Sequence, residues 1–162
     1  MLGSTHFIAG AAIGKLSGNP VLAIVLGFLF HFIQDLVPHF DYGYFFKKTV
    51  RSFAVAISDP FVGLIVWVLI GLLVGFDQQQ WINSFLGGAA CIAPDVFSVF
   101  IKLFKIEKLK KLNIFHARVH WFIKEEYDVF EWKKGYISKK GIILGLIYQI
   151  PFIVVSLWFL IK

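Results

Sequence analysis

The chain has 162 residues, 58% of them hydrophobic, and a formal net charge of +6. A mean hydropathy of +0.75 is too high for an ordinary soluble domain, and a single cysteine excludes both a disulfide framework and a cysteine-based metal motif. The length fits one domain, residues 1–162. We therefore predict an all-α integral membrane protein, a multi-pass bundle of about five helices.

The positions of the basic residues predict how this bundle is oriented. Apart from Lys15 and Lys162, every Lys and Arg falls within residues 47–51 or 102–140. If four long helices alternate in direction, both stretches share one side, which the positive-inside rule makes cytoplasmic, and the C-terminus lies outside. A basic protein can also bind nucleic acid. Basic segments beside membrane spans instead favour membrane lipids with anionic headgroups as partners, and no nucleic acid. The oligomeric state stays open.

The first two helices are predicted near residues 5–17 and 20–38. The first is short and contains AGAAIG, in which Gly10 and Gly14 form a small face suited to close helix contact. The turn SGNP follows, and its Pro20 is typical of the first position of a helix. Because no positive charge precedes the first apolar run, we expect this segment to remain in the mature protein.

The next two helices are predicted near residues 53–76 and 81–104, with the polar turn FDQQQW between them. Residues 105–135 mix aromatic and charged residues at helical spacing. This pattern predicts an amphipathic cytoplasmic segment with a helix that lies in the membrane interface. The last helix is predicted near residues 141–161. The amphipathic segment could cover whatever opens at the cytoplasmic end of the bundle.

A weak internal repeat relates the two halves of the helical region. TH followed by FIAG parallels SD followed by PFVG, and LGFLFHFIQD parallels LGGAACIAPD. The parallel predicts two repeated helical hairpins. Each would bring a polar residue at the start of its first helix close to an aspartate near the end of its second. These pairs are His6 with Asp35, and Asp59 with Asp95.

Three aspartates within apolar helices need compensation. Asp35, Asp59 and Asp95 would each cost about 2.5–3.5 kcal/mol in a transmembrane helix if they had no partner. No Lys or Arg lies beside them in the same helices. Histidines and a bound cation therefore remain as partners.

The histidine spacing predicts a divalent metal centre. His31 and Asp35 are four residues apart, as are His116 and His120 in HARVH, so each pair shares a helix face. Imidazole and carboxylate groups bind zinc, and also manganese or iron, where thiolates are missing. Zinc is the favoured metal. The candidates outnumber the ligands of one zinc, so we expect one or two ions, held by residues among His6, His31, Asp35, His39, Asp59, Asp95, His116 and His120.

Each of these residues also has a simpler interpretation. A single His in an apolar helix is commonly a hydrogen-bonded packing residue, and HARVH could bind lipid headgroups. Asp59 could cap a helix start, Asp95 could mark a proline kink, and His39 with Asp41 could lie in a solvated turn. These separate interpretations do not explain why the histidines and the intramembrane aspartates are all expected at one level of the bundle.

A metal at this level would support hydrolysis. It could bind a water molecule, make that water more acidic and hold an anionic oxygen of a substrate. Asp35 and Asp41 are the predicted catalytic carboxylates, and Asp41, past the helix end, is the candidate that shuttles the proton. Basic side chains would attract a substrate phosphate. They are Lys47, Lys48, Arg51 and Arg118.

The segment HFIQDLVPHFDYG resembles a group of small membrane-bound metal-dependent hydrolases, which carry an early His, a His-x-x-x-Asp helix, and Pro-Asp or Pro-His-x-Asp at helix ends. Those positions are here His6, His31 with Asp35, His39 with Asp41, and Asp95. The His-x-x-x-Asp followed by a Pro and a His is also similar to a metal-binding segment of zinc-dependent phospholipase C, although His39 lies closer to the Asp than in that family. The resemblance implies hydrolysis of a phosphoester.

The sequence thus predicts a metal-dependent hydrolase that acts on a phosphate or ester bond of a lipid or lipid-linked substrate at the cytoplasmic interface. Three other classes stay open. Intramembrane acids and histidines also occur in metal or proton transporters. Two histidines could bind haem axially in an electron carrier. A scaffold protein without chemistry is the third.

Overall fold

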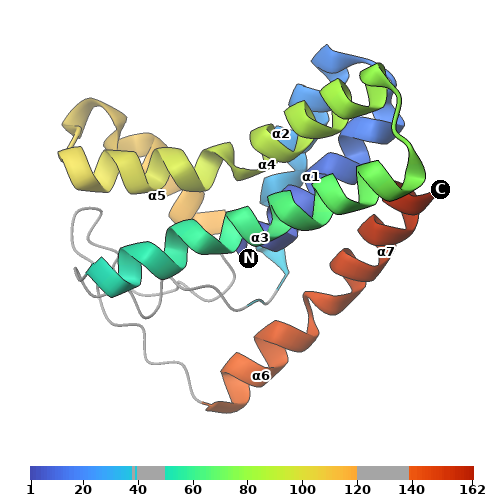
Figure 1. The fold of residues 1–162 in the computed structure, drawn as a ribbon. Coiled ribbons are helices and arrows are strands. Elements are labelled where there is room, and N and C mark those ends of the chain that lie inside the picture. The colour runs from blue at the N-terminus through green and yellow to red at the C-terminus, as the bar shows by residue number, and fades with distance from the viewer. Residues whose placement is uncertain (38, 40–49, 120–138) are drawn as a thin grey trace.

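The computed structural model describes residues 1–37, 39, 50–119 and 139–162, and the regular structure within them is helical, as predicted. Figure 1 shows the arrangement of these helices. In chain order they are α1 (Gly3–Ser17), α2 (Pro20–Leu36), α3 (Val50–Val74), α4 (Gln78–Phe104), the short 3₁₀ helix η2 (Glu107–Leu109), α5 (Lys110–Val119), α6 (Lys139–Ile147) and α7 (Ile150–Ile161).

The short helix α1 lies at the centre of the bundle and contacts α2, α3, α4 and α7 (Figure 1). Its glycines allow the closest approach. A Cβ atom on Gly10 would collide with the Cβ of Cys91 and the carbonyl of Gly87, and one on Gly14 would collide with the carbonyl of Asn83. The predicted contact face at Gly10 and Gly14 is therefore confirmed, and its partner is α4.

Gly87 provides a sensitive test of this packing. A Cβ there would collide with the Gly10 carbonyl, and one on Gly27 of α2 would collide with the carbonyl of Gly87. Overpacking typically costs about 1–3 kcal/mol, and here backbone rather than a side chain would have to move. We expect Gly87→Leu to lower the free energy of unfolding in detergent by about 3 kcal/mol. Ala89→Leu, at an exposed position of the same helix, should change it little.

Local capping sets the helix ends near the predicted positions. The Oδ1 atom of Asn19 accepts hydrogen bonds from the backbone N–H groups of Val21 (2.9 Å) and Leu22 (3.1 Å) at the start of α2. Gly18 before it has a φ of 61°, a left-handed conformation that glycine adopts without strain. At the start of α4, Asp77 and Gln80 form a capping box.

A last helix is predicted near residues 141–161, and the structure interrupts it at Tyr148 and Gln149, which separate α6 from α7. Pro151 in the first turn of α7 has no backbone N–H to continue a helical ladder. The buried Gln149 side chain stabilises the break. Its Oε1 accepts hydrogen bonds from the Leu2 backbone N–H (2.9 Å) and the Thr5 hydroxyl (3.2 Å), and its Nε2 donates to the Gly145 carbonyl (3.0 Å). Through Gln149, the break between α6 and α7 is therefore hydrogen-bonded to the start of α1.

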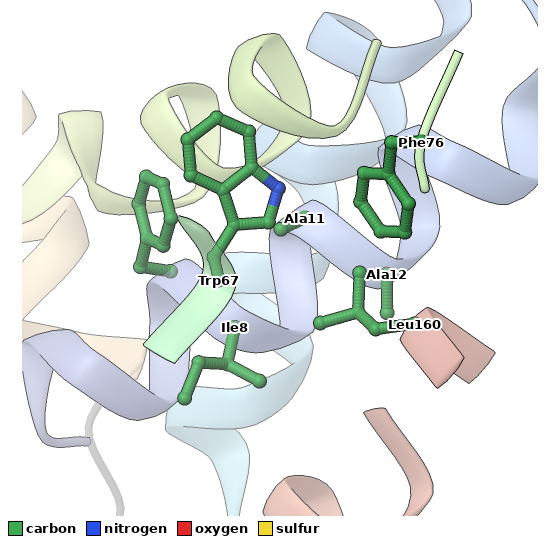
Figure 2. Packing of buried hydrophobic residues seen from close by; sticks show 7 residues of the cluster. Ile8, Ala11, Ala12, Trp67, Phe76 and Leu160 are labelled. Carbon is green, nitrogen blue, oxygen red and sulfur yellow. The ribbon is translucent and has the colours of Figure 1, made fainter. Parts of the chain in front are cut away.

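An apolar cluster fills the bundle beyond the first turn of α1. Figure 2 shows its side chains around Trp67, whose indole N–H donates to the Ser84 hydroxyl at 2.9 Å. The Phe7 and Trp67 rings meet edge to face, with centroids 5.7 Å apart. The cluster consists of Phe7, Ile8, Ala11, Ala12, Trp67, Phe76 and Leu160.

The outer surface of the bundle is unusually apolar. Among the described residues, three helical stretches are long and apolar enough to cross a membrane: Ile57–Val74, Gln78–Phe104 and Ile143–Ile161. Only 17% of the first and 22% of the last is buried inside the protein. The second predicted span corresponds to Pro20–Leu36, which is apolar but shorter.

The predicted amphipathic segment is described up to Val119, and residues 120–135 lie outside the described part of the chain. Within α5, Leu112, Phe115 and Arg118 are exposed, while Asn113 and His116 are buried. One face of this short helix thus packs on the bundle. The opposite face presents apolar and basic side chains together.

Candidate metal centre

A group of buried histidines and aspartates surrounds the end of α2. α1 contributes one residue to it, α2 two, the chain just after α2 one, and α4 and α5 one each. Most of these side chains are excluded from water, with exposures of 0% for His6, His31 and Asp35. The structure therefore brings together His6, His31, Asp35, His39, Asp95 and His116.

The Asp35 carboxylate is the centre of this group. The Nε2 atoms of His6 and His39 lie 3.2 Å and 3.6 Å from its Oδ1 atom. Those of His31 and His116 lie 3.0 Å and 3.4 Å from its Oδ2 atom. Imidazoles from separate segments therefore point the same ring nitrogen at one carboxylate.

Asp95 forms the more open side of the centre. Its Oδ1 atom lies 3.4 Å from His116 Nε2 and 3.9 Å from His31 Nε2, and its Oδ2 atom lies 3.8 Å from His6 Nε2. The Asp95 side chain is 33% exposed, whereas that of Asp35 is fully buried. Asp95 is therefore more exposed than His6, His31, Asp35, His39 and His116.

Backbone carbonyls fix the tautomers of two of the imidazoles. His31 Nδ1 lies 2.7 Å from the Cys91 carbonyl oxygen, and His39 Nδ1 lies 2.7 Å from the Val37 carbonyl oxygen. A carbonyl only accepts, so each Nδ1 carries the proton that it donates. The Nε2 atom of a neutral ring then presents a lone pair to the centre, as in histidines that bind metals.

Side chains hold the other two well-placed rings in a similar way. His6 Nδ1 lies 3.0 Å from the Gln34 Oε1 atom, which also accepts a hydrogen bond from the Cys91 thiol at 3.3 Å. His116 Nδ1 forms a short hydrogen bond with the Ser98 hydroxyl. Within the part of the chain that the structure describes, the buried His6 Nε2 atom has no hydrogen-bond partner.

The spacing of these atoms fits a bound cation. Lone pairs that face carboxylate oxygens repel them, and His31 Nε2 and His116 Nε2 are only 2.9 Å apart. Atoms that bind one metal at about 2.0–2.1 Å lie about 3.0–3.5 Å from one another, so a shared ion would turn this repulsion into coordination. One ligand atom each from His31, Asp35, Asp95 and His116 lies within 4.8 Å of the others. His6, His31 and Cys91 form a second such group.

One positive group of the chain also reaches Asp35. The amino group of Met1 donates a hydrogen bond to Asp35 Oδ1 at 2.9 Å, and both groups are fully buried. A single ammonium group offsets one negative charge. Asp35 and Asp95 together carry two, so one negative charge is left after this ion pair.

Asp59 has a different environment from the one predicted. Its Oδ2 atom accepts hydrogen bonds from the backbone N–H groups of Gly3 (2.5 Å) and Ser4 (3.3 Å), and its Oδ1 atom accepts from the Ser4 hydroxyl (2.7 Å). It belongs to neither group of candidate ligands among the described residues. Asp59 instead accepts hydrogen bonds from the backbone N–H groups at the start of α1.

The remaining predicted site residues are less well defined by the structure. Asp41, Lys47, Lys48 and His120 lie outside the described residues, as does the side chain of Arg51. Arg118 is exposed on α5, two residues after His116. The predicted proton shuttle and most of the predicted phosphate contacts therefore stay predictions.

The groups that orient the imidazoles were not predicted from the sequence. Ser98 follows Asp95 by three residues and Gln34 follows His31 by three, so each shares a helix face with a candidate ligand. That spacing is a signal that could have identified them. The contributions of the Met1 amino group and of Gln149 depend on tertiary contacts, which residue spacing within one helix does not predict.

Ser98 offers a direct test of this orienting role. Loss of a group that orients a metal-binding His typically weakens metal affinity 10–100-fold. We expect Ser98→Ala to weaken binding by about that factor in a competition titration with a chromophoric chelator. Ser98→Thr, which keeps a hydroxyl group, should retain most of the affinity. Wild-type affinity in Ser98→Ala would show that the hydrogen bond to His116 has no such role.

Comparison of the chain with protein-family models, with curated proteins and with solved structures finds no match. The described structure supports a buried His/Asp/Cys group that could hold a metal ion.

Proposed function

We propose that this chain is an integral membrane metalloenzyme that hydrolyses a phosphate or ester bond of a lipid or lipid-linked substrate at the membrane interface. The observation that carries the proposal is the convergence of imidazole Nε2 atoms on the buried Asp35 carboxylate. The resemblance of HFIQDLVPHFDYG to membrane-bound metal-dependent hydrolases supports the same class.

The distribution of polar and apolar groups supports membrane insertion. Large apolar side chains are exposed along the outer faces of α2, α3, α4 and α7, such as Leu29 (53%), Leu69 (54%) and Val154 (58%). Polar side chains such as His6, Gln34 and Asn83 are buried. An apolar exterior around a polar interior suits lipid as the surrounding solvent. The basic segments then favour the cytoplasmic side for the metal centre.

The donor set suits a divalent ion of borderline character. Neutral imidazoles and carboxylates bind zinc, and manganese or iron accept the same donors. Such an ion makes a bound water more acidic and polarises a phosphoryl or carbonyl oxygen. The partly exposed Asp95 marks the side from which substrate and water enter. Arg118, exposed on α5 close to His116 in sequence, would attract an anionic headgroup.

A transporter is less well supported. A transport path has to continue through the bundle, but the apolar cluster of Figure 2 follows His6 directly along α1. The Ser84 hydroxyl in that region accepts a hydrogen bond from the Trp67 indole N–H. The polar groups of the centre are thus separated from the opposite end by packed apolar side chains.

A haem carrier fits the geometry poorly. Axial histidines bind the iron from opposite faces of the porphyrin, so the ring lies between them. His31 and His116 have Nε2 atoms 2.9 Å apart and ring centroids 5.0 Å apart. No porphyrin fits between these two rings.

Hydrolysis of defined lipids tests the proposal. The purified full chain, reconstituted in nanodiscs and loaded with Zn²⁺ or Mn²⁺, is assayed with phospholipids and polyprenyl phosphates for released phosphate and fatty acid. We expect turnover that a chelator removes and added metal restores. His31→Ala should reduce it at least about 100-fold, because that ring contacts the centre directly. Asp77→Asn, which keeps a good N-cap at the opposite end of α4, is the matched control.

The outcomes separate the competing functions. Metal uptake into vesicles without hydrolysis of any lipid would favour a transporter. Turnover that is unchanged by chelation, or equal in His31→Ala and Asp77→Asn, would contradict a metal-dependent reaction at this centre.

A further inference from the structure

We propose that the centre binds two divalent ions, bridged by the carboxylates of Asp35 and Asp95. This inference rests on the metal binding of the proposed function and adds the number and arrangement of the ions. It follows from which oxygen of each carboxylate faces which imidazole.

Asp35 divides the imidazoles into two pairs. Its Oδ1 atom faces the Nε2 atoms of His6 (3.2 Å) and His39 (3.6 Å). Its Oδ2 atom faces those of His31 (3.0 Å) and His116 (3.4 Å). A carboxylate whose two oxygens each face separate nitrogen donors is arranged to bridge two ions.

Asp95 makes the same division independently. Its Oδ2 atom faces His6 Nε2 at 3.8 Å, whereas its Oδ1 atom faces His116 Nε2 at 3.4 Å and His31 Nε2 at 3.9 Å. Asp95 lies on α4 and Asp35 on α2. Two carboxylates from different helices thus assign His6 to one position and His31 with His116 to the other.

Each position has a mixed nitrogen and oxygen donor set. The first would use His6 Nε2 with the carboxylate oxygens nearest to it, Asp35 Oδ1 (3.2 Å) and Asp95 Oδ2 (3.8 Å), and His39 Nε2 lies 3.6 Å from the same Asp35 oxygen. The second consists of the Nε2 atoms of His31 and His116 with the other two carboxylate oxygens, which gives the four donors of a tetrahedral ion. Two-metal hydrolytic sites place their ions about 3.5–4 Å apart, and two bridging carboxylates suit that spacing.

The buried His6 Nε2 atom is a second, independent indication of the first position. It is fully buried and has no hydrogen bond among the described residues. An ion held only by His31 and His116 would leave the lone pair of His6 Nε2 facing the carboxylate oxygens. An ion at the first position uses it as a ligand.

Two divalent ions would also define the substrate class more narrowly. Together they exceed the charge of Asp35 and Asp95 by two positive charges, so an anionic group is attracted more strongly than a neutral ester. Two adjacent ions hold the attacking and leaving oxygens of a phosphoryl group. The arrangement therefore favours a phosphate ester over a carboxyl ester.

The competing arrangement is one ion with the Met1 amino group. That group lies 2.9 Å from Asp35 Oδ1, on the side of the first position. A single ion at the second position and an ammonium group at the first would then share the carboxylates. Metal stoichiometry distinguishes the two arrangements.

The test measures metal content and magnetic coupling in the full chain purified in mild detergent. With Zn²⁺, we expect two ions per chain by elemental analysis. With Mn²⁺, we expect the electron paramagnetic resonance signal of a spin-coupled pair. His6→Gln, which is close to the original side chain in volume, should lose one ion and the coupling. Asp77→Asn should retain both ions.

The possible failures are distinguishable. One ion per chain with an uncoupled Mn²⁺ signal overturns the two-ion arrangement and leaves a single-metal centre intact. A coupled pair that persists in His6→Gln overturns the assigned ligands. Substoichiometric metal in the wild-type protein overturns the two-ion inference and the proposed function together. The wild-type measurement needs no variant, so a folding defect in His6→Gln leaves the test decisive.

Discussion

Asp35→Asn should weaken metal binding by more than about 100-fold, the largest loss that we expect from any single substitution. Loss of a group that only orients a ligand already costs 10–100-fold. Asp35 lies within 3.6 Å of the Nε2 atoms of His6, His31, His39 and His116. Asparagine keeps the shape of the side chain and removes the charge that would hold a cation there.

Thermal unfolding with and without metal measures this effect. A ligand at about 100 times its dissociation constant stabilises the state that binds it by about 2.7 kcal/mol. We expect Zn²⁺ to raise the unfolding temperature of the wild-type protein and of Asp77→Asn, and to leave that of Asp35→Asn unchanged. An equal increase in all three proteins would place the metal away from Asp35.

Leu69→Arg should strongly impair membrane insertion. Leu69 is 54% exposed and lies within the apolar stretch Ile57–Val74. An Arg near the centre of a transmembrane helix costs about 2.5–3.5 kcal/mol, whereas the same change on a surface in water costs almost nothing. The substitution therefore distinguishes lipid from water as the solvent of this surface.

The measurement is the fraction of full-length protein that stays with membranes after alkaline carbonate extraction. We expect that fraction, and the yield of folded protein in detergent, to fall sharply for Leu69→Arg. Gln79→Arg, in the exposed first turn of α4, is the control and should behave like the wild type. Equal tolerance of both substitutions would contradict membrane insertion of α3.

The helix boundaries were largely predictable because local chemistry sets them. Asn19 with Pro20 and the Asp77 capping box are local signals for the starts of α2 and α4, and the structure uses them. The division between α6 and α7 was missed although Pro151 indicates it. A proline in an apolar run can be absorbed within a longer helix, as Pro60 is in α3 and Pro94 in α4. The stabilising contacts of Gln149 are tertiary.

The centre was predictable to the extent that helix spacing fixes it. The i, i+4 spacing of His31 and Asp35 and the repeat that pairs Asp35 with Asp95 indicated carboxylates that the structure brings to one place. Equivalent glycines of the repeat, Gly27 and Gly87, also meet where α2 crosses α4. The two repeated hairpins stay a prediction that these contacts support.

Asp59 shows where the repeat misleads. It occupies the position equivalent to His6, yet the backbone N–H groups of Gly3 and Ser4 supply its hydrogen bonds. A carboxylate in an apolar helix can be compensated by the start of a neighbouring helix as well as by a cation. Sequence spacing within one helix cannot distinguish these two partners, because the choice depends on how α1 packs against α3.

Elemental analysis of wild-type protein, purified in mild detergent without chelator and normalised by quantitative amino-acid analysis, tests the central claim most directly. We expect at least one tightly bound divalent ion per chain, held among His6, His31, Asp35, Asp95 and His116 and lost in Asp35→Asn. Substoichiometric metal at the same level in both proteins would show that imidazolium charges and the Met1 amino group alone compensate these acids, and would contradict a metal centre.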